Sequence, residues 1–357
     1  MRVLILSPTP PARGVLRSLT SLGVEPIVAR ANGEGETDGL VQYLRVSSRG
    51  DAEKPMDLRW SRRGLRAVVR DVRPQLLHVV GDPWTPTAEA GAAAARDLKI
   101  PYVLVGTSSL GGPRGVTARW QADRVRNGAA ALAGTVRPAL DHLLGGAATP
   151  KPTAVLPAGG LAIPAPWTQR PEPNPVVFAS VGRLVPERGV DLLLDALSES
   201  HGEWRLRVAG TGPVHETLEQ QAQRLGLSAR IEWLGAMPRD RLPAFWQDVD
   251  VLVAPSRSTA EWVEPTGAVV LQAMAHGVAP VVSRCGALPD VVGEGGLVVD
   301  DGDVAALTRA VQGLVAEPSR CRVIGNAARQ RVLEQQGDGP VAERMLLLWR
   351  RVLEKQP

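Results

Sequence analysis

Short apolar runs rich in β-branched residues alternate with amphipathic stretches along the whole chain. In the first half, the runs predicted to be buried strands are RVLIL, VEPIVA, LLHVV, PYVLV and TAVLP. Between them, GVLRSLTSL and PTAEAGAAAARDL have helical spacing, with Gly or Pro near their ends. Strands that alternate with helices are typical of parallel sheets, so the pattern predicts an α/β fold.

A second alternation begins near residue 176. Its predicted strands are VVFASVG, RLRVAG, RIEWLG, DVLVAP, APVVS and GLVV, separated by amphipathic helices such as ETLEQQAQRL. Residues 164–175, which precede it, contain Pro164, Pro166, Pro171, Pro173 and Pro175, a composition typical of a semi-rigid linker. We therefore expect three parts: a first domain over 1–165, a Pro-rich linker over 166–175 and a second domain over 176–339. The last helix, about 340–357, is amphipathic and is expected to pack back on the first domain.

Length and composition agree with two domains that each bury a core. The 357 residues exceed the roughly 150 of one domain, and 44% of them are hydrophobic. No stretch approaches the ~20 apolar residues of a membrane span, and MRVLIL is too short for a signal peptide. We expect a cytoplasmic protein without a transmembrane segment. Cys285 and Cys321 lack metal-ligand spacing and are interpreted as buried structural residues.

Charge is shared unevenly between the two halves. Residues 1–166 carry 21 basic and 13 acidic side chains (+8), and residues 167–357 carry 20 and 24 (−4). A basic half favours an anionic substrate, a membrane surface or nucleic acid, or is only solvated surface. The basic run at 58–73, LRWSRRGLRAVVRDVR, is predicted to be a helix with a solvated basic face, and a peripheral membrane contact stays open. We expect no nucleic-acid partner.

Two arginines lie on one predicted strand-to-helix loop. In FASVGRLVPERGVDLLLDAL, a strand ends at Gly182, and Arg183 and Arg188 flank the loop before the next helix. Two guanidinium groups on such a loop can hold a diphosphate from both sides. The alternative is that both are surface arginines. A second glycine turn, at Gly210 and Gly212, follows the next strand.

The stretch WVEPTGAVVLQAMAHG, residues 262–277, predicts a core helix that is apolar all round and begins near Gly267. The N-terminus of a buried helix offers unpaired N–H groups and partial positive charge, for which a phosphate is the natural occupant. Glu264 can accept hydrogen bonds from sugar hydroxyls, and Gln272 can bind another part of the ligand. The alternative is a plain buried helix with Glu264 near its N-cap.

The segments GRLVPERG, AGTGP, DVDVLVAPS and EPTGAVVLQAMAHGVAPVV, in this order and spacing, resemble the C-terminal domain of the retaining glycosyltransferases of family 4. The resemblance spans roughly residues 176–300. It implies an α/β fold of the GT-B type, with two doubly wound Rossmann-like domains facing a cleft.

The resemblance also implies roles for individual residues. The implied catalytic set is Arg183, which matches the family's diphosphate-binding arginine, Arg188, where the family usually has lysine, and Glu264, the first of a glutamate pair. Gln272 replaces the second glutamate, and TPPARG replaces the usual Gly-Gly turn after the first strand. The implied donor-binding positions are Gly14, Gly182, Gly210, Gly212, Met237, Thr266, Gly267, Ala268, Val269 and Gln272.

Contacts to the acceptor are expected in the first domain. His78 and Asp82 lie at a strand end in LLHVVGD, and Trp84 could stack on a sugar. Thr107 lies where family members often carry a histidine that faces the donor sugar. The family's scheme has cations that stabilise the leaving diphosphate and no dedicated protein base, so we expect neither a metal nor another cofactor.

The sequence thus predicts a retaining, metal-independent glycosyltransferase that uses a UDP- or GDP-sugar. A small acceptor is favoured, such as an aminocyclitol or another secondary metabolite in antibiotic biosynthesis. The alternatives are an enzyme of cell-envelope or lipid-linked glycan synthesis, a non-catalytic or pseudo-glycosyltransferase relative of the same fold, and a sugar-nucleotide epimerase. The donor base, the sugar, the acceptor and the oligomeric state are not determined by the sequence.

Overall fold

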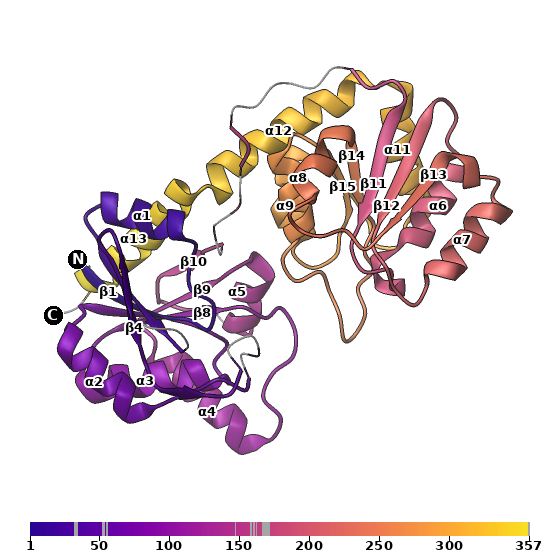
Figure 1. The fold of residues 1–357 in the computed structure, drawn as a ribbon. Coiled ribbons are helices and arrows are strands. Elements are labelled where there is room, and N and C mark those ends of the chain that lie inside the picture. The colour runs from indigo at the N-terminus through magenta and orange to yellow at the C-terminus, as the bar shows by residue number, and fades with distance from the viewer. Residues whose placement is uncertain are drawn as a thin grey trace. The chain divides into compact units, whose positions relative to one another are not determined.

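The chain folds into two compact units. A computed structural model describes residues 1–31, 35–51, 54, 56–146, 148–157, 159, 161, 163–165 and 172–355. Unit 1 comprises Met1–Gly160 and Gln336–Pro357, and unit 2 comprises Leu161–Gln335 (Figure 1). Most of the expected linker, residues 166–171, lies outside the described residues.

Within its described residues, unit 1 contains an eight-stranded sheet in the order β10-β9-β8-β7-β1-β2-β4-β3. All neighbours are parallel except the antiparallel pair β3 and β4. The strands are β1 (Arg2–Leu6), β2 (Glu25–Arg30), β3 (Glu36–Asp38), β4 (Val41–Arg45), β7 (Leu76–Val80), β8 (Tyr102–Gly106), β9 (Ala131–Gly134) and β10 (Thr153–Val155). A separate antiparallel pair is formed by β5 (Ser48–Arg49) and β6 (Arg59–Trp60).

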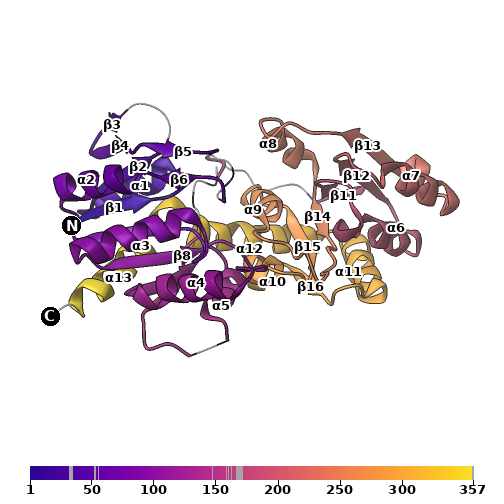
Figure 2. The ribbon, with the colours of Figure 1, turned by 90° about the horizontal axis from the view of Figure 1, so that it is seen from below.

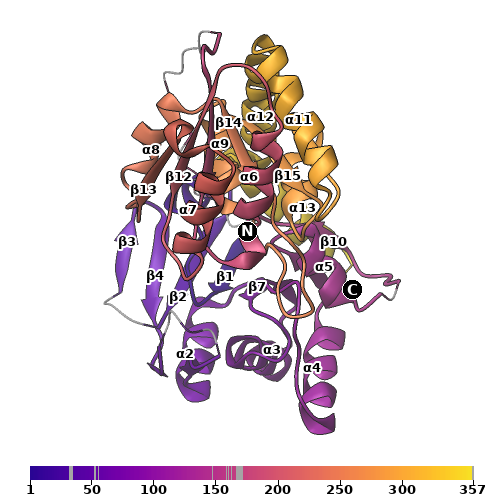
Figure 3. The same ribbon diagram turned by 90° about the vertical axis from the view of Figure 1, so that its right-hand side faces the viewer.

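Helices cover both faces of this sheet. They are α1 (Arg13–Ser21), α2 (Arg62–Val72), α3 (Pro86–Leu98), α4 (Val116–Gly128), α5 (Arg137–Leu144) and α13 (Asp338–Glu354). One apolar core joins α1 and α13 to one face, and the other joins α2, α3 and α4 to the opposite face. Figure 3 shows α2, α3 and α4 along one side of this sheet. The chain's last helix therefore belongs to unit 1, where it packs against α1.

The basic run at 58–73 forms β6 and α2. The apolar side chains of α2, Leu65, Val69 and Val72, are buried, and its arginines are exposed. Trp60 is also buried, and its indole N–H donates to Thr87 Oγ1 at 2.9 Å. Of its other apolar residues, Val68 is half-buried and Ala67 is exposed, so the exposed face of this helix is mainly charged. No described helix is both long enough and apolar enough to cross a bilayer.

Unit 2 contains, in its described part, a six-stranded parallel sheet in the order β13-β12-β11-β14-β15-β16. The strands are β11 (Val176–Val181), β12 (Trp204–Ala209), β13 (Ile231–Gly235), β14 (Val251–Ala254), β15 (Ala279–Ser283) and β16 (Leu297–Val299). The helices are α6 (Val190–Ser198), α7 (His215–Arg224), α8 (Leu242–Phe245), α9 (Ala268–Ala275), α10 (Leu288–Val292), α11 (Val304–Ala316) and α12 (Ser319–Gln336). The short α9 packs beside β14 and β15 (Figure 2). The predicted α/β class with two parallel-sheet, Rossmann-like domains is confirmed.

Each sheet has one point where the chain's connections leave in opposite directions. In unit 1, β1 lies between β2 and β7, and in unit 2, β11 lies between β12 and β14. At such a switch point the loops diverge and leave a crevice at the carboxyl ends of the strands. The crevices between β1 and β7 and between β11 and β14 are thus the places to look for ligand sites.

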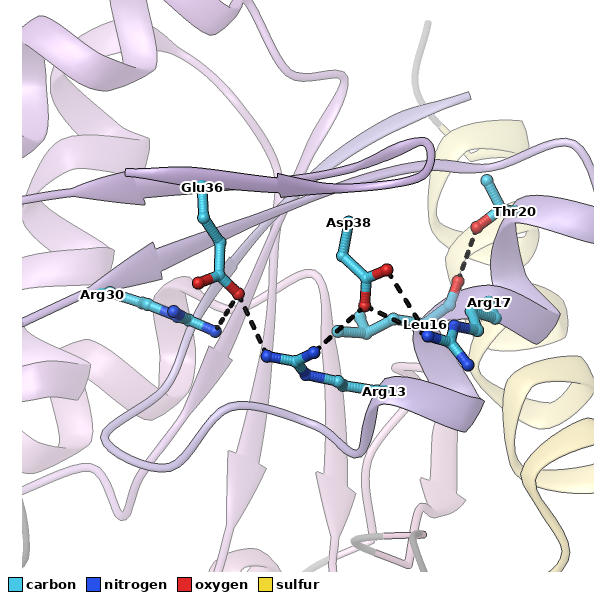
Figure 4. Close-up of polar contacts among 7 residues, drawn as sticks. All are labelled: Arg13, Leu16, Arg17, Thr20, Arg30, Glu36 and Asp38. Atoms are coloured by element: carbon cyan, nitrogen blue, oxygen red, sulfur yellow. Dashed lines mark hydrogen bonds and ion pairs between the residues drawn. The ribbon is translucent and has the colours of Figure 1, made fainter. Parts of the chain in front are cut away.

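The sequence pattern did not predict the hairpin of β3 and β4. Its first strand, Glu-Thr-Asp, has no apolar residue, and ion pairs hold it to α1 and β2 (Figure 4). Arg13 lies 3.2 Å from Glu36 and 3.6 Å from Asp38, Arg17 lies 3.4 Å from Asp38, and Arg30 lies 3.2 Å from Glu36. Because these pairs are partly exposed, each contributes about 1 kcal/mol or less.

Two helical glycines of unit 2 give a matched test of how closely α12 packs on the turn after α9. A Cβ on Gly325 in α12 would lie 2.0 Å from the carbonyl oxygen of Gly277, whereas one on Gly313 in α11 would meet only the end of the Arg320 side chain at 3.3 Å. We expect Gly325→Ala to lower the free energy of unfolding by about 1–3 kcal/mol. Gly313→Ala should raise it by up to about 1 kcal/mol through helix propensity. Urea unfolding of both variants checks this, and equal effects would contradict the packing described.

Candidate functional site

The loop that follows β11 carries both predicted arginines at the crevice of unit 2. Gly182 and Arg183 come directly after the strand, and Arg188 ends the 3₁₀ turn Pro186–Arg188. These three residues line one small cavity of about 20 Å³ together with residues that follow β14, including Ser256. The structure therefore brings Gly182, Arg183 and Arg188 to the carboxyl ends of β11 and β14.

Arg188 and Glu264 form an ion pair, although they are 76 residues apart in the sequence. The Glu264 side chain is 7% exposed and that of Arg188 is 31% exposed. The guanidinium carbon of Arg188 also lies 5.2 Å from the ring centroid of Trp262, within the range of a cation–π contact. Arg188 is therefore fixed by a carboxylate and an aromatic ring that both come from the loop before α9.

Arg183 differs from Arg188 in having no side-chain partner among the described residues. Its side chain is exposed, and it forms no ion pair or hydrogen bond with any residue in the described part of the chain. Its positive charge is therefore not balanced within the described protein. The Arg183 guanidinium is therefore available to form charge-assisted hydrogen bonds with an anion in this crevice.

The N-terminus of α9 lies next to Glu264. Gly267, the N-cap residue, has φ 62°, and its N–H donates to Glu264 Oε1 at 3.3 Å. No described side chain caps the helix, so N–H groups of its first turn are available to an anion. Ala268 is exposed and Val269 half-buried, which shows that the prediction of a helix buried all round was wrong for its first turn. The exposed Thr266 directly precedes this turn.

The second glycine turn packs directly on the arginine loop. A Cβ on Gly210 would lie 1.8 Å from the carbonyl oxygen of Gly182, and one on Gly212 would lie 2.0 Å from that of Leu184. Any side chain at either position would push the loop of Arg183 out of place. Met237 lies two residues beyond β13, at the same end of the sheet.

Two buried polar atoms near these residues have no hydrogen-bond partner in the described part of the chain. They are the Gln272 Oε1 and the hydroxyl of Ser256, a residue that is 1% exposed and lines the small cavity. A buried polar atom without a partner costs about 1–3 kcal/mol, so such atoms mark places where a ligand can supply the missing bond. Ser256 is a site residue that the sequence analysis missed.

The loop between β14 and α9 is anchored by contacts that sequence patterns do not reveal. Arg257 forms a two-bond ion pair with Asp191 of α6, at 3.1 and 2.5 Å, and donates to the Pro186 carbonyl at 3.2 Å. Cys285 Sγ accepts from the Glu264 N–H at 3.4 Å, and burial raises the pKa of this thiol. These contacts fix the backbone on both sides of Glu264.

The crevice of unit 1 contains a larger cavity, of about 280 Å³. It lies among the loop after β1, the ends of β7 and β8, and α13, and His78 and Thr107 line it. His78 is 3% exposed, and the indole N–H of Trp349 donates to its Nδ1 at 3.2 Å. Burial lowers the pKa of His78 to about 4, so the ring is neutral at pH 7 and its proton lies on Nε2.

Asp82 is buried, and its carboxylate accepts four hydrogen bonds from the loop after β8. Thr107 donates from its N–H at 2.9 Å and its hydroxyl at 3.0 Å, and Ser108 donates from its N–H at 3.1 Å and its hydroxyl at 2.6 Å. Asp82 thus anchors this loop. A direct contact between Asp82 and an acceptor would require the loss of some of these bonds.

The remaining predicted residues of unit 1 lie elsewhere. Trp84 makes an edge-on contact with His142, with ring centroids 5.7 Å apart, and lines a different hollow of about 250 Å³. Gly14 lies within α1, where a Cβ would overlap the carboxylate of Asp338 at 1.7 Å. This glycine therefore allows α1 and α13 to pack closely. In the described ranges, no group of three His, Cys, Asp or Glu side chains could hold a metal ion.

The titration of His78 tests its burial. We expect ¹⁵N-histidine NMR spectra to show one ring that stays neutral down to about pH 4, and this signal should be missing in His78→Gln but present in the control His142→Gln. Because the unfolded chain binds this proton near pH 6.5, stability should fall as the pH drops from 6.5 to 4, by up to roughly 1.4 kcal/mol per pH unit. Five rings that all titrate near 6.5 would contradict this.

In sequence, the chain is similar to known proteins mainly over unit 2. Residues 166–331 match the model of the family Glycosyl transferases group 1. A GDP-mannose-dependent alpha-(1-6)-phosphatidylinositol monomannoside mannosyltransferase of Mycolicibacterium smegmatis is 38% identical over 168 residues, which cover 45% of this chain and 44% of the relative. An alpha-maltose-1-phosphate synthase of the same organism is 32% identical over 193 residues, covering 50% and 49%. The chain spans about half the length of the curated relatives it matches.

Solved structures match along the whole chain. A sucrose-phosphate synthase from Thermosynechococcus elongatus has a TM-score of 0.68 and 18% identity, covering 99% of both chains. Anabaena HepE in complex with UDP has a TM-score of 0.67 and 16% identity, covering 98% of this chain and 100% of that one. At these identities the likeness establishes the fold alone. The chain therefore has the GT-B fold, and its residues 166–331 are similar to the family Glycosyl transferases group 1.

Proposed function

We propose that the chain is a retaining glycosyltransferase of family 4 that transfers a sugar from a UDP- or GDP-sugar to a small-molecule acceptor in the cytoplasm. Unit 2 binds the donor and unit 1 the acceptor, without a metal or other cofactor. The observation that carries the proposal is the unbalanced Arg183 beside the fixed Arg188 and the uncapped first turn of α9. These groups suit a diphosphate.

The chemical requirement of the reaction is to stabilise negative charge on the departing diphosphate. Arg183 is free to form charge-assisted hydrogen bonds with it, and the N–H groups of Ala268 and Val269 add fixed dipoles. Arg188 enters this site already paired with Glu264. The positive charge that stabilises the bound diphosphate therefore comes mainly from Arg183 and the N-terminus of α9. Arg188, held by Glu264, mainly shapes the site.

Glu264 and Gln272 have complementary tasks in this proposal. Glu264 holds Arg188 and the Gly267 N–H, and its remaining lone pairs can accept bonds from hydroxyls of the donor sugar. The partnerless Oε1 of Gln272 supports a role in binding the donor ribose. A neutral amide gives a weaker hydrogen bond to a hydroxyl than a carboxylate does.

A second candidate is an enzyme whose acceptor is linked to a lipid. The relative that is 38% identical is a GDP-mannose-dependent alpha-(1-6)-phosphatidylinositol monomannoside mannosyltransferase, whose acceptor is linked to a lipid. On α4, Val116 is 83% and Trp120 65% exposed, four residues apart on one side of the helix. An exposed aromatic and aliphatic pair of this kind favours contact with a membrane surface.

Nucleotides should stabilise the protein. We expect UDP or GDP at 100 times its dissociation constant to add ~2.7 kcal/mol to the stability of the folded state. A thermal-shift series over UDP, GDP, ADP and CMP, with inorganic phosphate as control, measures this. A series in which none of these ligands raises the melting temperature would remove the donor site from the proposal.

Arg183→Ala should lower turnover by orders of magnitude without affecting the fold. The loss of one donor to developing charge lowers kcat by about 10²–10³. Release of nucleoside diphosphate from UDP- and GDP-sugars measures turnover without a known acceptor. The matched control is Arg224→Ala, which removes an exposed arginine from the end of α7. An active Arg183→Ala would overturn this mechanism, and a wild-type protein that never releases diphosphate would favour a non-catalytic relative.

A further inference from the structure

The described residues that line the cavity of unit 1 carry no charged side chain. Its walls are formed by proline-rich backbone after β1, by aliphatic side chains such as Leu156 and Met345, and by hydroxyl residues such as Thr107 and Thr135. None of the lining residues in the described part of the chain is Asp, Glu, Lys or Arg. The one titratable lining side chain, His78, is neutral at pH 7. A ligand in this cavity therefore meets no formal charge.

Most of the hydroxyl groups of the wall are already used within the protein. Ser7 donates to the carbonyl of Thr9, Thr85 donates to the carbonyl of Asp82 at 2.8 Å, and Thr107 donates to the Asp82 carboxylate at 3.0 Å. The hydroxyls of Thr9 and Thr135 make no hydrogen bond with a residue of the described chain, and of the two Thr9 is exposed whereas Thr135 is half-buried. Thr135 thus offers a polar contact to a ligand.

Charged residues that are close in sequence to the cavity-lining residues have their partners within the protein. Arg13, two residues after the lining Pro11, pairs with Glu36 and Asp38 of β3 (Figure 4). The carboxylate of Asp82 is occupied by four hydrogen bonds. The N-terminus of α3, an obvious place for an anion, is capped by the Thr85 hydroxyl, which accepts from the Ala88 N–H at 3.3 Å.

We infer that the part of the acceptor that enters unit 1 is an uncharged, mostly apolar ring that bears a hydroxyl group, with Thr135 as its polar contact. This inference rests on the proposed function and narrows its acceptor class. A phosphate, carboxylate or ammonium group would lose its hydration here and gain no opposite charge. The volume of about 280 Å³ lies near the lower end of ligand pockets, roughly 300–1,000 Å³, and suits one or two rings.

The test uses three probes that share one ring and one exocyclic carbon: cyclohexylmethanol, protonated aminomethylcyclohexane and cyclohexanecarboxylate. They are titrated into the full chain labelled with ¹³C at its methionine methyl groups. The chain has five methionines, of which Met345 lines the cavity and Met237 lies at the proposed donor site. We expect cyclohexylmethanol to shift the Met345 signal, assigned with Met345→Leu, and both ions to bind at least roughly tenfold more weakly.

Variants test whether cyclohexylmethanol binds in the cavity. Thr135→Val keeps the volume but removes the hydroxyl, and should weaken cyclohexylmethanol binding several-fold, whereas Thr135→Ser should retain it. Thr117→Val, at an exposed position of α4, is the matched control and should bind as the wild type does. A carboxylate or ammonium probe that shifts Met345 as strongly as the alcohol would overturn the inference, as would an alcohol affinity that Thr135→Val leaves unchanged.

The same spectra separate this inference from the proposed function. UDP or GDP should shift Met237 and leave Met345 unchanged. A Met237 response to nucleotide, with no response of Met345 to any probe, would overturn the acceptor class and keep the donor site. A Met345 response to the alcohol without any nucleotide response would keep the uncharged cavity and overturn the proposed enzyme.

Discussion

Both candidate sites depend on one constraint of the parallel sheets. In each sheet, two neighbouring strands have connections that leave in opposite directions. In unit 1 these strands are β1 and β7, and in unit 2 they are β11 and β14. Their carboxyl-end loops diverge, and the backbone cannot close the space between them. The same constraint thus gives a cavity without charged side chains among the described residues of unit 1 and a site with one unbalanced arginine in unit 2, because the loop sequences differ.

In unit 2 the two arginines of one loop have different physical states. Arg188 is paired with Glu264 and lies over Trp262, whereas Arg183 is exposed and without a partner in the described structure. A balanced charge stabilises the loop at little electrostatic cost, while an unbalanced one attracts an anion. The ion pair between Arg257 and Asp191 joins the loop after β14 to α6, so this loop is held by contacts within unit 2.

In unit 1 the net charge of the chain does not predict the chemistry of the cavity. The first 166 residues carry a net charge of +8 (21 basic, 13 acidic), yet none of the described residues that line the cavity has a charged side chain. The arginines of α2 are exposed, and Arg13 pairs with acidic residues of β3. A basic composition therefore describes the surface of this unit, while the ligand chemistry follows from the few side chains at the strand ends.

The sequence by itself determined the α/β class, the two strand-helix series, and the loop and glycine turns with Arg183, Arg188 and Gly210, because these features depend on residues close together in the chain. Tertiary structure alone decided which residues became partners: Arg188 with Glu264, Asp82 with Ser108, and His78 with Trp349, 271 residues away. It also gave Gly14 a packing role against Asp338 and formed β3 from three polar residues. These outcomes depend on contacts distant in sequence, whose energies leave no local periodicity for a sequence pattern to show.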